Sequence, residues 1–407
     1  MKPDQDQTPI IRQTPVLITS AVLIGLGGIV FVTQAMGAHP ERVWMAYLIN
    51  FLLWSAISQG GLLFSAVMHI TRARWSASMA GVAEAFSAFF PISLILFLVL
   101  LLGKTYLFPW IGQDLHGKEV WLNTGFLFTR DALGLLVLYA LGGAYLYYAL
   151  GFKLSDHPPD NGLRRWFYRV WNRHEPDMEK RSARMTFFSI LYILAFVVVL
   201  SLIGYDWVMA ADPHWYSTLF GAYTFVKAFY VGLGGIIILA SFLKLKSPSA
   251  VPLADAHFHD VGKLFLGFCL VWADFFYCQF LVIWYGNIPE ESAYIIERTL
   301  RDPYRVVAWT VFAISFLLPF FILLNRRIKM MPRAMTLLCT VVIAGIWLEH
   351  LLLLAPALQP HAESVSVGLT EAAVTLGFFG LMLAAVTLFL NRFPELVMTG
   401  SRSVMED

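Results

Sequence analysis

The chain has 407 residues, of which 58% are hydrophobic and only 14% are charged, and its mean hydropathy is +0.67. About a quarter of the residues in an ordinary soluble domain are charged, so this composition excludes that class and indicates an integral membrane protein. The formal net charge of +2 is small and its carriers are scattered, which argues against a nucleic-acid partner.

Ten apolar stretches are long enough to cross a bilayer, which takes about 20 mostly apolar residues in a helix. Unpaired backbone groups are forbidden in hydrocarbon and little sequence is left for strands, so we expect an all-α fold rather than a barrel. Spans two to five and six to nine could form two four-helix bundles, although no motif of fixed period supports a repeat. The expected spans cover residues 16–37, 43–70, 80–103, 126–150, 185–211, 216–243, 258–286, 306–325, 335–357 and 370–391 of a single polytopic domain, 1–407.

The positively charged residues are shared unequally between the two sides. An even number of spans puts both termini on one side, and 20 of the 29 Lys and Arg residues lie there, against 6 on the other side and 3 inside the spans. Loops that remain in the cytoplasm carry the excess of Lys and Arg. We therefore expect both termini to be cytoplasmic, in a multi-pass protein of the cell inner membrane.

The longest loop on the cytoplasmic side, 151–184, contains the segment "NGLRRWFYRVWNR". In a helix, its aromatic residues, including Trp166 and Trp171, would share one face, and Arg165, Arg169 and Arg173 would lie along another. This pattern predicts an amphipathic helix in the plane of the lipid headgroups. A solvated basic loop is the alternative.

Ionisable side chains inside the spans are the candidate functional residues, because each one costs several kcal/mol unless it is paired or hydrated. They fall into three tiers of depth. Glu84, His257, His259 and Asp260 lie toward the cytoplasmic side, Asp131, Asp206, Glu349 and His350 lie toward the other side, and Lys227 and Asp274 lie between them.

Lys227 and Asp274 are predicted to form an ion pair. Lys227 lies 17 residues before Lys244, and Asp274 lies 17 residues after His257, so both are about 25 Å from the cytoplasmic boundary. Their helices are consecutive and antiparallel, and pairing would lower the desolvation cost of each charge. The pair could be static and fix the register of the helices, or it could be the centre of a proton relay formed by the ten residues of the three tiers.

Cofactor sites are not expected in this chain. The three cysteines are not closely spaced as zinc or iron–sulfur ligation requires, and the histidines do not face one another at matched depths as a transmembrane haem requires. A Gly-rich phosphate loop of the P-loop type is also missing from the sequence. We expect no catalytic residue and no metal ligand.

Two long segments, "YDWVMAADPHWYSTLFGAY" at 205–223 and "FHDVGKLFLGFCLVWADFFYCQFLVIWYGNIPEE" at 258–291, carry a resemblance to a known family. With the N-terminal "AHPERVWMAYLINFLLWSAISQGGLLFSAVMHITRARWS" and "AEAFSAFFPIS", they resemble the F subunits of alternative complex III, which are similar to the NrfD and polysulfide-reductase membrane proteins. The resemblance extends over nearly the whole chain.

The resemblance implies ten transmembrane helices, with two four-helix bundles flanked by spans one and ten. It implies an assembly with an NrfD-like sister subunit, an iron–sulfur subunit and multihaem cytochrome c subunits, which oxidises menaquinol or ubiquinol and passes electrons to cytochrome c or an oxidase. In such an assembly the F subunit binds no cofactor of its own and supports assembly and proton movement. The family has small or apolar residues near the position of Lys227, so a relay through this lysine would be particular to this chain.

Two other functions stay open. A stand-alone secondary transporter would use the central pair as its ion or substrate site and would have broken helices around it. Alternatively, the chain could itself hold the quinol site, and Asp206 or Asp131 near the outer face would then accept the quinol protons.

Overall fold

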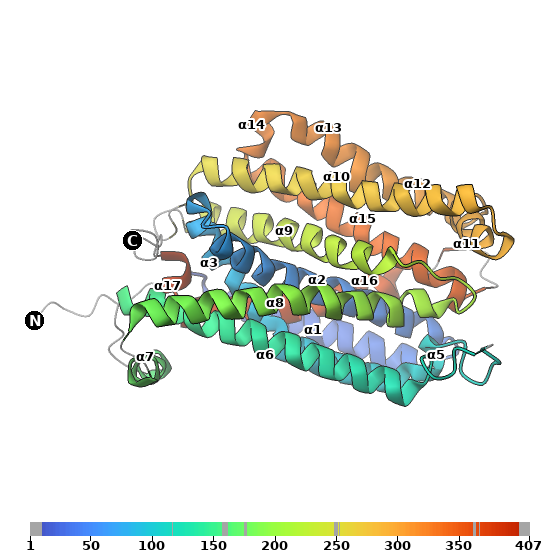
Figure 1. Cartoon of the computed structure of the whole chain (residues 1–407), viewed down its shortest axis with the longest axis horizontal. Helices are drawn as coiled ribbons and strands as arrows, with labels where there is room; N and C mark the ends of the chain where they lie inside the picture. Colours follow the sequence, from blue (N-terminus) through green and yellow to red (C-terminus); the bar gives the residue numbers. More distant parts are fainter. Residues whose placement is uncertain are drawn as a thin grey trace, which may run out of the picture.

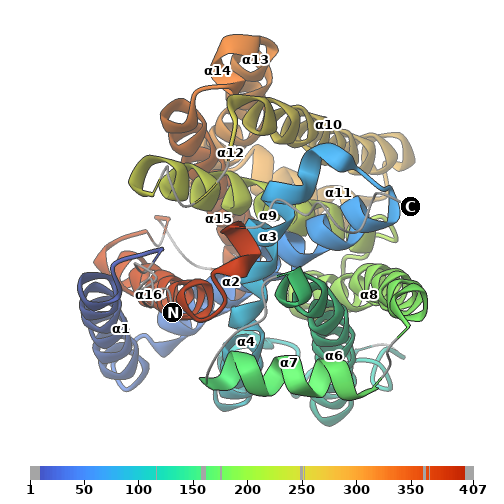
Figure 2. The same cartoon turned by 90° about the vertical axis from the view of Figure 1, so that its left-hand side faces the viewer.

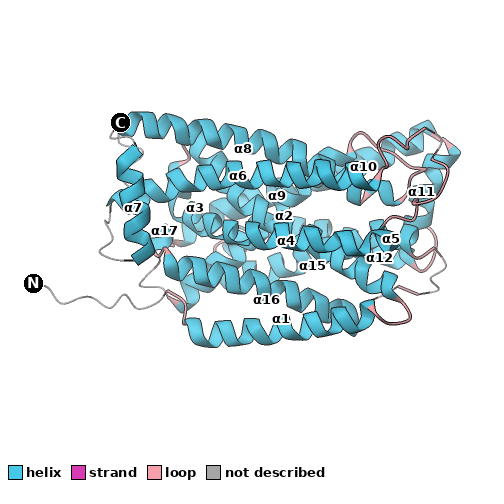
Figure 3. Ribbon diagram, turned by 90° about the horizontal axis from the view of Figure 1, so that it is seen from below, coloured by secondary structure: helices cyan, strands magenta, loops and turns pink. Residues whose placement is uncertain are grey.

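The computed structural model describes residues 10–115, 117–156, 162–174, 177–247, 251, 253–360, 364–365 and 367–398. Within these residues the regular structure is entirely helical (Figure 3), and ten helical segments are long and apolar enough to cross a membrane. The predicted all-α membrane fold with ten spans is therefore confirmed. Eight spans have one α-helix each: α1 (Gln13–Ala35), α2 (Pro40–Ile70), α6 (Thr124–Asp156), α8 (Met178–Trp207), α9 (Phe220–Lys246), α10 (Asp255–Gly286), α15 (Pro332–Leu358) and α16 (Leu369–Arg392). The span of α8 continues through the 3-10 turn η4 (Met209–Ala211).

The other two spans are composite. The third span comprises α3 (Ala77–Glu84), η2 (Ala85–Phe89), α4 (Phe90–Leu100), η3 (Leu101–Gly103) and α5 (Lys104–Leu107), and the eighth comprises α12 (Tyr304–Phe312), η5 (Ala313–Leu317) and α13 (Leu318–Leu324). The segment η2 is a 3-10 turn that precedes a proline near the start of α4. A proline lacks the backbone donor that a continuous helix needs there. The Ser58 hydroxyl donates to the Phe86 carbonyl at 2.8 Å and so satisfies one backbone group of this turn.

The spans run side by side along the long axis of the molecule (Figure 1). The helix α1 begins and α16 ends at the same end, which we call the terminal end, and α5 and α11 (Pro289–Thr299) lie at the opposite end. Seen from the terminal end, α2, the third span, α6 and α8 form one four-helix group, and α9, α10, the eighth span and α15 form the other (Figure 2). The helices α1 and α16 pack as a pair at the side.

The two four-helix groups meet where α2 crosses α9. At this crossing Gly60 and Gly232 bring the two backbones into contact: a Cβ on Gly60 would lie 2.3 Å from the Ala228 carbonyl oxygen. Only glycine allows so close an approach. Because α2 and α9 are the most buried spans, this crossing fixes how the two groups fit together.

Short helices cover the terminal end. The helix α7 (Gly162–His174) lies across the spans in front of α6 (Figure 2), inside the loop where a helix was predicted. Its two tryptophans differ, since Trp166 is 60% exposed whereas Trp171 is 2% exposed and packs against Gly151 of α6. One of the residues expected to face lipid headgroups thus packs inside the protein. Near α7 and α3 lies α17 (Glu395–Met398), and α14 (Arg326–Lys329) follows the eighth span.

Candidate functional site: two buried ion pairs and the cavity between them

A lysine and a glutamate form a buried ion pair in the group that contains α9, α10 and α15. Lys227 Nζ of α9 lies 3.0 Å from Glu349 Oε1 of α15, and the two residues are 3% and 2% exposed. Lys227 lies 7 residues after Phe220, and Glu349 lies 9 residues before Leu358. At about 1.5 Å per residue, the pair is about 10 to 14 Å from the opposite end of these helices. Lys227 therefore has a carboxylate partner, as its burial requires.

That partner is Glu349, and the predicted pairing of Lys227 with Asp274 is wrong. Asp274 lies on the neighbouring α10, but its side chain is exposed on the outer face of that helix. Two positions earlier, Trp272 faces inward, and its Nε1–H donates to Glu349 Oε2 at 3.2 Å. A step of two residues turns a helical side chain by about 200°, although it changes the depth by only about 3 Å. Depth alone therefore pointed to a residue on the wrong face.

Three donors hold the Glu349 carboxylate. Besides Lys227 and the tryptophan of α10, the Tyr223 hydroxyl donates to Glu349 Oε1 at 2.5 Å. The next residue of α15, His350, is 4% exposed, and its Nδ1 lies 2.8 Å from the Ile346 carbonyl oxygen. This contact makes Nδ1 the protonated nitrogen, so Nε2 is an acceptor. The site thus places an ammonium, a carboxylate, a phenol and an imidazole together.

A second buried lysine–glutamate pair lies in the other four-helix group, nearer the terminal end. Lys153 Nζ of α6 lies 2.7 Å from Glu84 Oε2 of α3, and these residues are 8% and 2% exposed. Glu84 Oε1 accepts a hydrogen bond from Ser65 Oγ at 2.8 Å, and Ser65 is bonded to the Tyr145 hydroxyl at 2.9 Å. In the sequence Lys153 looks like part of the 151–184 loop, so this pair was not predicted.

The helix α17 covers the Glu84–Lys153 pair at the terminal end. Gly81 of α3 lies so close to α17 that a Cβ at this position would overlap the Leu396 carbonyl oxygen, and it would lie 3.3 Å from Lys153 Nζ. Leu396 is 0% exposed, and the neighbouring Glu395 forms an ion pair with Arg164 of α7. Protein rather than water therefore lies directly over Lys153.

Hydroxyl groups lie between the two pairs, on α2, the third span, α6 and α8. The Tyr192 hydroxyl of α8 lies 2.7 Å from Gln59 Oε1 and 2.9 Å from the Gln59 carbonyl oxygen. Tyr139 of α6 lines the same cavity as Gln59. The Tyr139 hydroxyl lies 2.8 Å from Ser93 Oγ, which lies 2.6 Å from Ser55 Oγ. These groups form a polar line through an otherwise apolar core.

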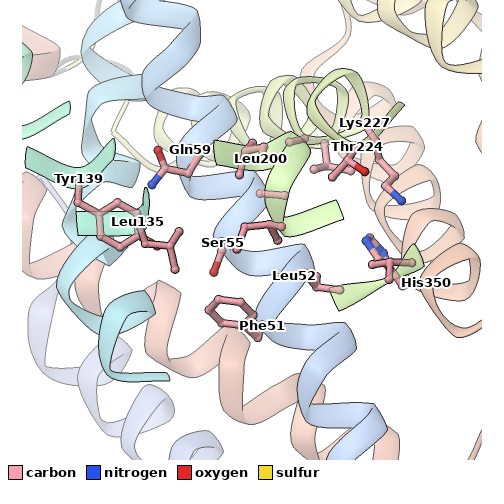
Figure 4. Close-up of a pocket in the computed structure, with 15 residues that line it drawn as sticks. Phe51, Leu52, Ser55, Gln59, Leu135, Tyr139, Leu200, Thr224, Lys227 and His350 are labelled. Atoms are coloured by element: carbon pink, nitrogen blue, oxygen red, sulfur yellow. The ribbon is translucent and has the colours of Figure 1, made fainter. Parts of the chain in front are cut away.

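A small internal cavity connects this polar line to Lys227. The centres of water molecules can occupy about 30 Å³ of this cavity. Because one water needs roughly 10–15 Å³ by this measure, the cavity has room for about two. Gln59 and Tyr139 lie at one side of the cavity and Ser55 lies in the middle (Figure 4). At the other side, the Lys227 ammonium points toward the His350 ring (Figure 4). The lining comes from α2, α6, α8, α9 and α15, so the cavity lies where the two four-helix groups meet.

Beyond Glu349, aromatic and charged groups lead toward the surface of the opposite end. The Tyr294 ring of α11 stacks on Trp215 with ring centroids 3.8 Å apart, and Arg298 lies 3.4 Å from the centre of the Tyr294 ring. Arg298 is 4.0 Å from Asp212, whose side chain is 25% exposed. Burial raises the pKa of Tyr294 to about 12, while the Arg298 charge lowers this pKa and the charges of Asp212 and Glu349 raise it. Tyr294 therefore stays protonated near neutral pH.

Asp206 and Asp131 form a separate cluster at the opposite end of α6 and α8. Arg130 donates through Nε to Asp206 Oδ2 at 2.7 Å and through Nη2 to Asp206 Oδ1 at 2.6 Å, and Trp121 Nε1–H donates to Asp206 Oδ1 at 3.0 Å. Asp131 Oδ2 accepts from Trp207 Nε1–H at 2.8 Å. Among the described residues, no hydrogen bond or ion pair links this cluster to Glu349 or His350, with which the two aspartates were grouped by depth.

His257, His259 and Asp260 lie at the start of α10, at the terminal end. His257 Nδ1 accepts from the Ala254 backbone N–H at 3.1 Å, and His259 Nδ1 lies 3.4 Å from Asp260 Oδ1. The Lys263 ammonium lies 2.9 Å from the same Asp260 oxygen. In the described part of the chain, these residues make no hydrogen bond or ion pair with either buried lysine–glutamate pair. They are a surface cluster and not a continuation of the polar line.

Most of the buried acids were predictable from the sequence, but the groups that hold them were not. Arg130 was treated only as a cation inside a span, and the uncharged donors Tyr223 and Trp272 were not considered. Hydroxyl groups such as those of Tyr139 and Tyr192 escape a screen for ionisable residues because tyrosine is common in apolar cores. Tyr139 and Tyr145 lie on α6 and Tyr192 lies on the neighbouring α8, and a sequence pattern does not show which way these phenols turn.

Among the described residues, no group of three or more His, Cys, Asp or Glu side chains could hold a metal ion. The sequence matches no protein-family model and no curated protein. The resemblance to the F subunits of alternative complex III therefore remains a prediction from the quoted segments. The site must be interpreted from its own chemistry.

Proposed function

We propose that this chain is a membrane subunit of a quinol-oxidising electron-transfer complex and that it carries protons through the membrane part of that complex. The observation that supports proton movement is the polar line described above. The line begins at the Glu84–Lys153 pair, continues through hydroxyl groups and the cavity, and ends at the Lys227–Glu349 pair. The resemblance of the quoted segments to the F subunits supplies the type of complex.

The proposed assembly contains an NrfD-like sister subunit, an iron–sulfur subunit and multihaem cytochrome c subunits, and it is located in the cell inner membrane. In it the terminal end faces the cytoplasm, because 20 of the 29 Lys and Arg residues lie on that side. Quinol and the redox centres belong to the other subunits. The role of this chain is then confined to proton movement and to assembly.

The geometry suits proton transfer in short steps. Lys227 Nζ and Glu349 Oε1 are 3.0 Å apart, which is within direct hydrogen-bond reach, so a proton can pass between them without an intermediate water. On the cavity side, the His350 Nε2 acceptor and about two waters would connect Lys227 to Gln59 and Tyr139. On the other side, the Tyr223 hydroxyl leads from Glu349 toward Tyr294 and the surface. Proton transfer along such a line requires only small movements of side chains.

A secondary transporter has less support. The helix α9 runs unbroken from Phe220 to Lys246 through the position of Lys227, although broken helices were expected around a transport site. The cavity beside Lys227 has room for about two waters and not for an organic substrate.

A quinol site at Asp206 or Asp131 also has less support. Asp206 is 0% exposed, and Arg130 and Trp121 already occupy its oxygens. A larger groove near them, between the third span and α6, is lined by residues such as Phe97 and Phe128 and by neither aspartate.

The test is to measure protons moved per electron by the assembled complex in liposomes. Glu349→Gln and Lys227→Met remove the two groups on which the polar line converges, so each is expected to lower the proton-to-electron ratio while quinol oxidation continues. Arg305→Met is the matched control, because it removes a cation from an exposed ion pair at the opposite end. A ratio that stays the same in all three variants would exclude this path.

Membership in a complex is tested separately by gentle solubilisation. Co-purifying iron–sulfur and multihaem proteins, detected by haem absorbance, would support the subunit role. A colourless protein that purifies alone would contradict it and leave the proton path to be tested on the isolated chain.

A further inference from the structure

The outer face of α10 carries a carboxylate in the middle of the membrane. Asp274 is exposed, and the only partner that the described residues give it is the Cys278 thiol, 3.9 Å away on the same helix. A thiol is a weak donor and supplies no positive charge. Among the described residues, Asp274 is therefore a mid-membrane acid without a cation.

The depth of Asp274 can be measured from its own helix. It lies 11 residues after Lys263 and 11 residues before Tyr285. Eleven residues are about three helical turns and about 16 Å, while half of a 30 Å hydrocarbon core is about 15 Å. Lys263 and Tyr285, both exposed, are residue types that prefer the two membrane interfaces. Asp274 consequently lies near the midplane, where an unpaired charge is most costly.

The residues around Asp274 form a continuous exposed surface. We call it the Asp274 stripe: Lys263, Leu270, Asp274, Tyr277 and Tyr285, which share one side of α10. Gly267 lies on the same side, and a Cβ there would meet no atom within 4 Å. Gly267 is partly exposed, and small residues of this kind are common where transmembrane helices pack.

Another exposed surface at similar depth shows what a lipid-facing helix looks like in this protein. The outer side of α8 exposes Phe187, Ile190, Leu194 and Val198, which are all apolar. Hydrocarbon selects such a surface, because nothing on it needs a partner. The Asp274 stripe differs from it by the tyrosines Tyr277 and Tyr285, by Lys263 at its end and, at the midplane, by a carboxylate that favours a partner from outside the chain.

From this we propose that the Asp274 stripe is covered by a transmembrane helix of a different protein, with a Lys, Arg or His side chain at the membrane midplane that pairs with Asp274. A second copy of this chain would not supply the cation. In the described spans, the one lysine of the mid-membrane tier is Lys227, which is 3% exposed and already bonded to Glu349. The inference rests on Asp274 and its surroundings, and it holds whether or not the chain conducts protons.

Photo-crosslinking of the full chain in its native membrane tests this proposal. A benzoylphenylalanine side chain replaces Tyr277 in the stripe or, as the matched control, Val198 on α8. Each position lies 9 residues before the end of its helix. From position 277 we expect an adduct whose peptide comes from a transmembrane segment with a Lys, Arg or His within about one helical turn of the crosslink. From position 198 we expect adducts with lipid only.

Charge exchange then tests the pairing itself. Asp274→Lys should lower the yield of the adduct from position 277 roughly five- to thirtyfold, the effect of losing one polar contact between membrane helices. Replacing the partner's cation by Asp should restore the yield in the Asp274→Lys chain. Gel filtration and native gels confirm that each variant is folded. Asp274→Leu is a second variant, which removes the carboxylate without placing a new charge in the membrane.

Three results would overturn the proposal. They are lipid adducts alone from position 277, a crosslinked helix without a cationic residue at that depth, and a crosslink to a second copy of this chain. None of them bears on proton flux, so the proposed function would stand or fall on its own measurement.

Discussion

The two buried lysine–glutamate pairs contain the same two side chains but differ in how they are held. Glu349 accepts hydrogen bonds from Lys227, Tyr223 and Trp272, and its lysine lies well inside a continuous helix. The Glu84–Lys153 pair has one additional donor, Ser65, and its lysine lies 3 residues from the end of α6. The Lys227–Glu349 pair is therefore fixed deep in the protein, whereas the Glu84–Lys153 pair lies near the terminal end beneath α17.

This difference indicates how each pair balances its desolvation cost. A buried ion pair is stable only when its geometry is good and its remaining hydrogen-bonding sites are satisfied. The Lys227–Glu349 pair meets this condition through aromatic donors from two neighbouring helices. The Glu84–Lys153 pair meets it with one further donor, Ser65, and lies beneath α17 near the terminal end.

The largest effect should come from breaking the deeper pair. Lys227→Met leaves the Glu349 carboxylate buried without a cation, and we expect a loss of about 3 to 5 kcal/mol in the free energy of unfolding. Unfolding of the purified chain in mixed detergent micelles measures this loss. The double variant Lys227→Met/Glu349→Gln should recover at least half of it, because no buried charge remains. A double variant as unstable as the single one would contradict this account.

Breaking the shallower pair should cost less. In Lys153→Met, water can reach Glu84 once α17 moves, so we expect a loss of about 1 to 3 kcal/mol by the same measurement. The contrast between the two pairs would disappear if Lys153→Met were as damaging as Lys227→Met. Lys153→Arg, which keeps the charge, is the control for the loss of packing.

Disturbing the packing between the two four-helix groups should have an intermediate to small effect on the free energy of unfolding. Gly60→Ala forces a Cβ against the Ala228 carbonyl oxygen at the α2–α9 crossing, and overpacking of this kind costs about 1 to 3 kcal/mol. The control is Gly143→Ala in α6, where a Cβ would meet no atom within 4 Å and no loss of stability is expected. Equal effects of the two substitutions would show that the crossing is not tight.

The smallest effect should come from Tyr294, which lies between the Lys227–Glu349 pair and the surface of the opposite end. The folded chain holds the Tyr294 proton up to about pH 12, whereas an unfolded tyrosine loses its proton near pH 10. Between these values the folded state binds more protons, so this residue's contribution to stability is present below about pH 10 and is lost as the pH rises toward 12. Tyr294→Phe should flatten that part of the curve of thermal midpoint against pH. If the slope between about pH 10 and 12 were the same in Tyr294→Phe, the Tyr294 hydroxyl would be in contact with water and not buried.

The fold was predictable from the sequence because hydrocarbon imposes a simple rule on length and polarity. All ten spans were found, and the acids that matter, such as Glu84 and Glu349, were found from their cost in a membrane. Their pairings were not. Lys153 lies beyond the end of its apolar stretch, and Asp274 has the right depth on the wrong side of α10. A linear pattern gives only an approximate depth, since Glu349 and Lys227 were placed in different tiers, and the direction of a side chain around its helix depends on how neighbouring helices pack.

The contact between α17 and Gly81 affects how the chain can be shortened. The four residues of α17 cover the Lys153 ammonium. Truncating the chain before Glu395 would therefore expose this buried charge to solvent. Among the described residues, the short helix α17 thus contributes to keeping solvent from this lysine. Loosening that helix, for example at Leu396, offers a way to open one end of the protein while its interior stays intact.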